Sequence, residues 1–228
     1  MTTPRHPTAA GLALTLALAT APAWATVEPQ GPNETVCPNP ALTAFDRESA
    51  GHVWPALTGT PLAPGGSVLT LGTNPSESPE LSDEVLRSFA RSFSFNTAQG
   101  IVSGTVLQLI KRGTDQRCKA EWQITVSPES LGCVTAIRID GFLHPLDKPL
   151  VADYRDDLPG DTSPDRAYRS AGDGSKLRFR VPGGVCAGKT SRPLLLNTSI
   201  NKMARKGSLQ LQGPAGELSP PVSTYVPK

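Results

Sequence analysis

Apolar and polar residues alternate along much of the chain, and this alternation predicts β-strands. The segment Lys119–Val126 places Ala120, Trp122, Ile124 and Val126 at every second position, with polar residues between them. A period of two is typical of a strand that buries one face. Further strands are predicted at Ser67–Leu71, from Ser88 to Phe95, and at Ile101–Arg112, Val134–Asp140, Lys176–Val181 and Ser208–Leu211, and Pro193–Asn197 is predicted to form a buried apolar run. Because no βαβ crossover pattern accompanies them, we expect an all-β fold, a single antiparallel β-sandwich domain over residues 66–228.

The segments between these strands have weaker patterns. Residues 26–65 are rich in Pro, Thr, Asn and Gly and are predicted to form an extended N-terminal segment. Short helical pieces are predicted at Ser82–Leu86 and Ser199–Arg205, and a turn at Pro182-Gly183-Gly184. The stretch Leu146–Asp173 has little periodicity and is predicted to be a long connection.

The N-terminus has the pattern of a cleaved signal peptide over residues 1–25. Arg5 precedes an apolar run from Ala9 to Ala19, and Ala23-Trp24-Ala25 supplies the cleavage site. The run is shorter than the roughly 20 residues needed to cross a bilayer. We therefore expect a mature chain that begins at Thr26, has no transmembrane segment, and is secreted or periplasmic.

Composition agrees with a loop-rich β protein. The 228 residues include 21 Gly and 23 Pro, and only 5% are aromatic. The formal net charge is +2, which argues against nucleic acid or an anionic membrane as the partner. With few aromatic side chains for the core, disulfides are an expected supplement to stability.

Four cysteines, all in the expected mature part, predict two disulfides. Their wide spacing excludes a CxxC redox pair and a four-cysteine zinc site, and three pairings are open. If Lys119–Val126 and Val134–Asp140 form a hairpin, Cys118 and Cys133 begin at its opposite ends, too far apart for a bridge. Because Cys133 and Cys186 both border loops at one end of the predicted sandwich, the preferred one of the two remaining pairings is Cys37–Cys118 and Cys133–Cys186.

The long connection carries the densest group of chemically active side chains. Calcium takes six to eight oxygen ligands, which closely spaced carboxylates of an exported protein supply. The spacing does not fit an EF-hand, and neighbouring basic residues favour a solvated loop with local ion pairs as the other interpretation. The candidate calcium ligands are Asp153, Asp156, Asp157, Asp161 and Asp165.

Two tryptophans are candidates for stacking on a sugar ring. Trp122 shares its face of the predicted strand with Ala120 and Ile124, so we expect it in the core. Trp54 precedes Pro55 in a loop segment and is the candidate ligand-binding residue.

Several stretches resemble a loosely defined group of uncharacterised exported bacterial β-sandwich proteins, some of which carry a PEP-CTERM-type sorting tail. The resemblance covers about residues 88–225 and includes, among other stretches, Ser92-Phe93-Ser94-Phe95-Asn96, Glu121-Trp122-Gln123-Ile124 and Ile137-Arg138-Ile139-Asp140-Gly141-Phe142. It implies a fold and no site residues, and the sorting tail is absent from this sequence.

These observations favour a non-catalytic binding or structural module of the cell envelope or extracellular space, with a protein or glycan partner. The alternatives are a secreted hydrolase or a calcium-dependent carbohydrate-binding module that uses the Asp-rich residues 147–165.

Overall fold

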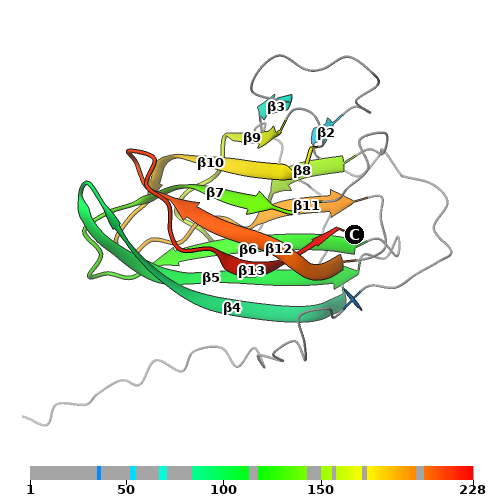
Figure 1. The fold of residues 1–228 in the computed structure, drawn as a ribbon, viewed down its shortest axis with the longest axis horizontal. Helices are drawn as coiled ribbons and strands as arrows, with labels where there is room; N and C mark the ends of the chain where they lie inside the picture. Colours follow the sequence, from blue (N-terminus) through cyan, green and yellow to red (C-terminus); the bar gives the residue numbers. More distant parts are fainter. Residues whose placement is uncertain are drawn as a thin grey trace, which may run out of the picture.

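The computed structural model describes residues 35–36, 52–54, 67–70, 84–112, 118–142, 150–155, 158–170, 174–198 and 203–227. These residues form thirteen strands and no helix, and the strands make two antiparallel sheets that pack together (Figure 1). The predicted all-β antiparallel sandwich is confirmed. Over the same ranges, nothing resembles a helix long and apolar enough for a membrane span.

Sheet A has the strand order β1-β12-β7-β10-β9-β3, and β13 also pairs with β12. Every pairing in it is antiparallel. Its strands are β1 (Thr35–Val36), β3 (Ser67–Thr70), β7 (Val134–Asp140), β9 (Arg166–Arg169), β10 (Lys176–Val185), β12 (Met203–Gln212) and β13 (Val222–Pro227).

Sheet B has the order β2-β8-β11-β6-β5-β4, also antiparallel throughout. Its strands are β2 (His52–Trp54), β4 (Glu84–Thr97), β5 (Gly100–Arg112), β6 (Cys118–Val126), β8 (Leu150–Tyr154) and β11 (Leu194–Thr198).

The core lies between the sheets and follows the alternation of the sequence. Trp122 and Ile124 of sheet B and Ile137 and Phe179 of sheet A are fully buried in one cluster. The prediction that Trp122 belongs to the core is confirmed, and its Nε1 donates a hydrogen bond to Thr224 Oγ1 at 3.2 Å.

A buried amide joins the two sheets between β5 and β13. The side chain of Gln108, 2% exposed, donates from Nε2 to the carbonyl of Tyr225 at 2.9 Å. Its Oε1 accepts the N–H of Tyr225 at 3.0 Å and the hydroxyl of Thr224 at 2.8 Å. Gln108 therefore makes for Tyr225 the two hydrogen bonds that a neighbouring strand would make.

Three local predictions were wrong, and each concerns the end of a strand. Residues 84–86 belong to β4 and residues 203–205 to β12, where short helices were predicted, because strand pairing overrides weak helix signals. Pro182-Gly183-Gly184 lies inside β10 rather than ending it. Gly183 and Gly184 have φ of 72° and 74°, and the register with β7 shifts between Arg180 and Val185, as in a bulge.

The conditional hairpin of residues 119–126 and 134–140 does not form. β6 pairs with β5 and β11 in sheet B, whereas β7 pairs with β10 and β12 in sheet A. The chain therefore changes sheets between these strands.

The predicted pairing of Cys133 with Cys186 is nevertheless confirmed, with a Cα–Cα distance of 4.2 Å. This disulfide joins the start of β7 to the residue after β10, so it links neighbouring strands of sheet A. Cys118 is also disulfide-bonded, and its predicted partner Cys37 lies outside the described residues.

The N-terminal part contributes to both sheets. Of the predicted extended segment 26–65, β1 pairs with β12 and β2 pairs with β8. The predicted signal peptide, residues 1–25, lies outside the described residues.

Candidate functional site

The outer face of sheet A carries a row of polar side chains that crosses four strands. Gln210 of β12 lies opposite Arg138 of β7, which lies opposite Arg178 of β10, which lies opposite Tyr168 of β9. Because side chains alternate between faces, this row points away from the core, to which the adjacent Leu177 belongs. Antiparallel register thus brings together side chains from positions up to 72 residues apart in the sequence, the separation of Gln210 from Arg138.

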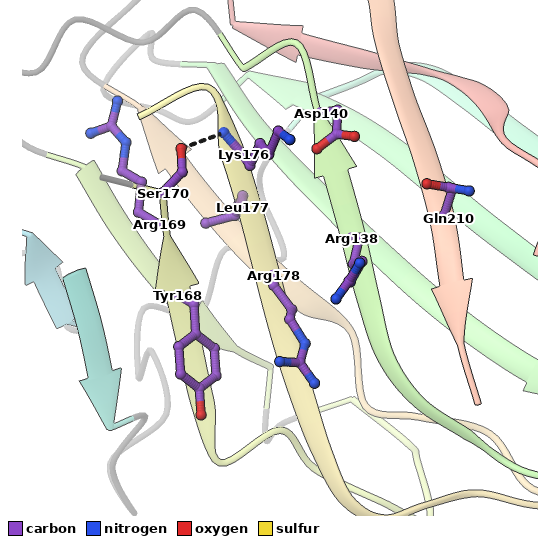
Figure 2. Close-up of a pocket in the computed structure, with 9 residues that line it drawn as sticks. All are labelled: Arg138, Asp140, Tyr168, Arg169, Ser170, Lys176, Leu177, Arg178 and Gln210. Carbon is purple, nitrogen blue, oxygen red and sulfur yellow. Dashed lines mark hydrogen bonds between the residues drawn. The ribbon is translucent and has the colours of Figure 1, made fainter. Parts of the chain in front are cut away.

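This row lines a hollow of about 300 Å³ on the sheet (Figure 2). Asp140 and Lys176, opposite each other on β7 and β10, line it one step further along. Arg169 also borders it but is 1% exposed, and its Nε donates to the carbonyl of Gly174 at 3.1 Å. Apart from that buried arginine, the hollow has three cationic side chains and one carboxylate.

Two of the cations are an arginine pair on neighbouring strands. Arg138 is oriented by a hydrogen bond from its Nε to Gln212 Oε1 at 3.0 Å. The guanidinium of Arg178 lies 5.5 Å from the centre of the Tyr168 ring, and its Nε is buried without a hydrogen-bond partner in the described structure. Burial, and then the positive charge of Arg138, lower the pKa of Arg178. An anion between these groups would offset both effects by its attraction to the two guanidinium groups.

An ion pair borders the next row of the same face. Arg180, two residues beyond Arg178, lies opposite Arg166 and forms a two-point contact with Asp165, in which its Nε donates to Oδ1 at 2.8 Å and its Nη2 to Oδ2. The hydrogen bond from Arg180 lowers the pKa of Asp165. Asp165 thus neutralises one cation of this face and leaves the arginine pair as the open part.

The predicted calcium ligands have separate roles where they are described. Asp161 accepts the N–H of Thr190 on Oδ2 at 2.8 Å, and Asp165 pairs with Arg180. Asp153 lies in β8, with only its backbone described, and Asp156 and Asp157 lie outside the described residues. In the described ranges, no group of three or more His, Cys, Asp or Glu residues is placed to hold a metal ion.

The connection that contains these aspartates is more ordered than its sequence suggests. Residues 150–154 and 166–169 form strands β8 and β9, where a long connection of little periodicity was predicted. The pairing of β8 with β11 and of β9 with β10 explains the difference.

Trp54, the predicted ligand-binding residue, lies opposite Leu150 at the end of β2. Only its backbone is described, so stacking by its side chain stays a prediction.

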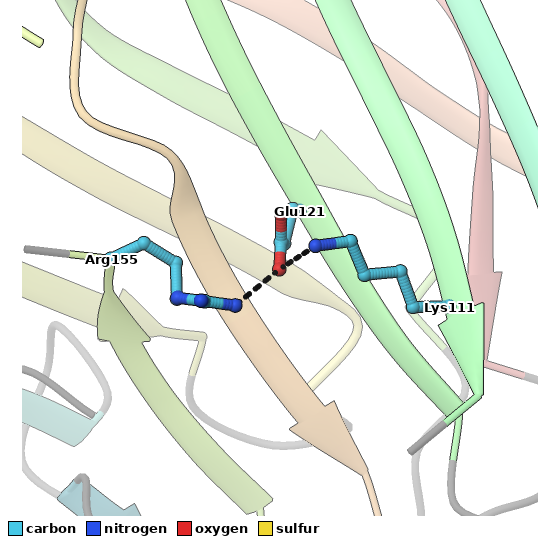
Figure 3. A network of polar contacts seen from close by, with 3 residues as sticks. All are labelled: Lys111, Glu121 and Arg155. Atoms are coloured by element: carbon cyan, nitrogen blue, oxygen red, sulfur yellow. Dashed lines mark hydrogen bonds and ion pairs between the residues drawn. The ribbon is translucent and has the colours of Figure 1, made fainter. Parts of the chain in front are cut away.

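A second group of charges lies on the outer face of sheet B and is buried (Figure 3). Oε1 of Glu121 accepts from Lys111 Nζ at 2.8 Å and from Arg155 Nη1 at 3.3 Å. The side chains of Glu121 and Arg155 are 2% and 1% exposed. Glu121 Oε2 has no hydrogen-bond partner in the part of the chain that is described. The closeness and burial of these three groups are typical of a structural ion network.

The sequence contained part of the signal for the hollow on sheet A. Lys176, Arg178 and Arg180 alternate with apolar residues in the predicted strand, which places three cations on one face. The contribution of Arg138, Tyr168 and Gln210 depends on the register of β7, β9 and β12, which no pattern within one strand specifies.

Comparisons with protein-family models, curated proteins and solved structures found no match to this chain. The resemblance to exported bacterial β-sandwich proteins therefore stays a prediction.

Proposed function

We propose that this protein is an exported, non-catalytic binding module that holds an anionic ligand in the hollow on the outer face of sheet A. The observation that carries the proposal is the arginine pair: Arg138 and Arg178 lie opposite each other on neighbouring strands, and no carboxylate of the described residues lies between them.

The surroundings of the pair suit recognition of an anion. Both arginines stand on the central strands β7 and β10, which restricts their positions before a ligand arrives. A guanidinium offers several N–H donors in a fixed plane, which match the two oxygens of a carboxylate or the oxygens of a sulfate or phosphate. Gln210 and the Tyr168 hydroxyl add neutral hydrogen-bonding groups to the same row.

Export is supported by two independent features. The N-terminal 25 residues have the pattern of a cleaved leader. The Cys133–Cys186 disulfide is compatible with an oxidising compartment.

Retention of the mature chain on immobilised dextran sulfate, with neutral dextran as reference, tests the binding function. We expect salt-sensitive retention on dextran sulfate alone, since the attraction is electrostatic. The substitution Arg178→Gln should reduce binding about tenfold, the effect of losing a hydrogen bond to a charged group. Lys189→Gln, which removes an equal charge from an exposed turn, is the matched control. Equal retention of all three proteins would overturn the proposal.

A further inference from the structure

The outward positions of β10 form a line of cations that continues beyond the hollow. Lys176, Arg178 and Arg180 occupy every second position of this strand. Residues i and i+2 of a strand are about 7 Å apart, so a ligand lying along β10 would meet Lys176 and Arg178 at that interval, followed at the same spacing by Arg180, which is paired with Asp165. A linear ligand with repeated negative charges fits such a line better than a single small anion.

The other residues that line the hollow indicate which chemical groups the ligand carries besides its negative charges. Asp140 lies beside the cations, opposite both Lys176 and Ser208. An ionised carboxylate accepts hydrogen bonds and repels anions, so the ligand must present hydroxyl donors next to its own charge. A chain of sugar acids has this composition, with one carboxylate and several hydroxyls in each unit.

The same lining disfavours a nucleic acid. Single strands bind by stacking their bases on aromatic side chains along a positive groove. Tyr168 is the aromatic residue of the hollow, and the guanidinium of Arg178 already lies against its ring. The net charge of the whole chain is only +2, so the positive charge of this face is a local feature and not part of a strongly basic surface.

We propose that the ligand is a linear acidic polysaccharide of the polyuronate class, which lies along β10 with one carboxylate between Arg138 and Arg178 and neighbouring hydroxyls at Asp140 and Gln210. This inference rests on the proposed function, because it names the ligand of the same hollow. Asp165 limits the site at one end, since it neutralises Arg180.

The test measures binding of the mature chain to polygalacturonate, to fully methyl-esterified polygalacturonate and to the galacturonate monomer. Polygalacturonate should bind, and esterification, which removes the charge and keeps the hydroxyls, should weaken binding about tenfold or more. The monomer should bind more weakly than the polymer, because it meets one cation pair only.

Variants locate the binding on β10. Arg178→Gln and, independently, Arg138→Gln should each reduce the affinity for polygalacturonate about tenfold. Asp165→Asn should increase it several-fold, because Arg180 is then free to meet a further carboxylate. Lys189→Gln should change nothing.

The outcomes separate the two proposals. Binding to dextran sulfate or single-stranded DNA that depends on Arg178, together with no binding to polygalacturonate, overturns the polyuronate and leaves the anion-binding function standing. Equal binding of the monomer and the polymer overturns the linear ligand. Failure of every polyanion to bind, or equal binding by Arg178→Gln and the unsubstituted chain, overturns both.

Discussion

Both outer faces of the sandwich carry charged side chains at alternate strand positions, but the surroundings of these charges differ between the two faces. On sheet B, Glu121 stands between Lys111 and Arg155, and the three charges are buried together (Figure 3). On sheet A, Arg138 and Arg178 face each other at the hollow, and among the residues that the structure describes no carboxylate lies between them (Figure 2). The cations of sheet B thus share a carboxylate of the chain, whereas the described residues place none between the two arginines of sheet A.

This difference distinguishes two roles that a charged residue has in a sheet. A buried carboxylate that pairs with two cations offsets the cost of removing the three charges from water. Without the carboxylate, the two cations stay buried with no such compensation, and the fold is less stable. A pair of like charges on a partly open face adds little to folding, and its presence favours a ligand-binding role as a hypothesis. The two faces should therefore respond differently to the loss of one charge.

The largest effect is expected from Glu121→Gln. It keeps the shape of the side chain and leaves Lys111 and Arg155 buried beside each other without the carboxylate they share. We expect the free energy of unfolding to fall by about 3–5 kcal/mol, as when one partner of a buried ion pair is removed. Urea denaturation measures this difference.

The control applies the same substitution to an exposed ion pair. Oε2 of Glu84 lies 3.4 Å from Nη1 of Arg112, and the side chain of Glu84 is 64% exposed. Glu84→Gln should cost less than about 1 kcal/mol, the usual range for surface pairs. If Glu121→Gln cost no more than Glu84→Gln, the structural interpretation of the buried network would be wrong.

The disulfide of sheet A supplies the next largest effect. Cys133 and Cys186 are 53 residues apart in sequence, and their bond restricts the unfolded chain. Replacing both by Ser should lower the free energy of unfolding by about 2–4 kcal/mol in urea denaturation.

The folded double variant should keep its affinity for dextran sulfate, because the ladder between Lys176 and Arg180 still sets the register of the arginine pair. Loss of binding by the folded variant would show instead that the disulfide, rather than the strand ladder, positions the arginines.

The sequence predicted the centres of strands better than their ends. The prediction for Val134–Asp140 has the bounds of β7, because apolar and polar residues alternate along it except at Ala136-Ile137. The start of β12 carries helix-favouring residues such as Met203, Ala204 and Lys206, and only its pairing with neighbouring strands makes it extended.

The candidate site could be predicted only in part, for a related reason. Alternation reveals that Arg178 shares a face with Lys176, but the partner across the ladder is set by register between distant strands. The aspartates predicted as calcium ligands are close together in sequence, whereas Asp161 and Asp165 make different protein contacts in space. The disulfide shows the same limit, since Cys133 pairs with Cys186 although the conditional hairpin used to rank this pairing does not form.

A smaller effect on stability is expected from the ion pair of Asp165 with Arg180, which lies beside the arginine pair on the outer face of sheet A. The pKa of Asp165 is lowered in the folded chain, so its contribution to stability is present above its ordinary pKa of about 3.9 and is lost as the pH falls through the folded value. The side chain is 32% exposed, which limits the contribution to less than about 1 kcal/mol.

Unfolding free energies of the unsubstituted chain and of Asp165→Asn, measured between neutral pH and about pH 2, check this sign. The two curves should differ by a constant amount above about pH 5 and converge below about pH 4. A difference that grows on acidification would contradict the assignment of the ion pair.

The smallest effect is expected from Arg178→Gln, and it is the sharpest contrast between the two faces. The substitution removes the contact with the Tyr168 ring and also the repulsion from Arg138, so the unfolding free energy should change by no more than about 0.5 kcal/mol. Arg155→Gln, the matched change beside Glu121, should cost several times more. Dextran sulfate should raise the melting temperature of the unsubstituted chain more than that of Arg178→Gln, because a ligand stabilises a fold more when it binds that fold more tightly. Equal destabilisation by the two substitutions would mean that the arginine pair, like the network on sheet B, serves the fold.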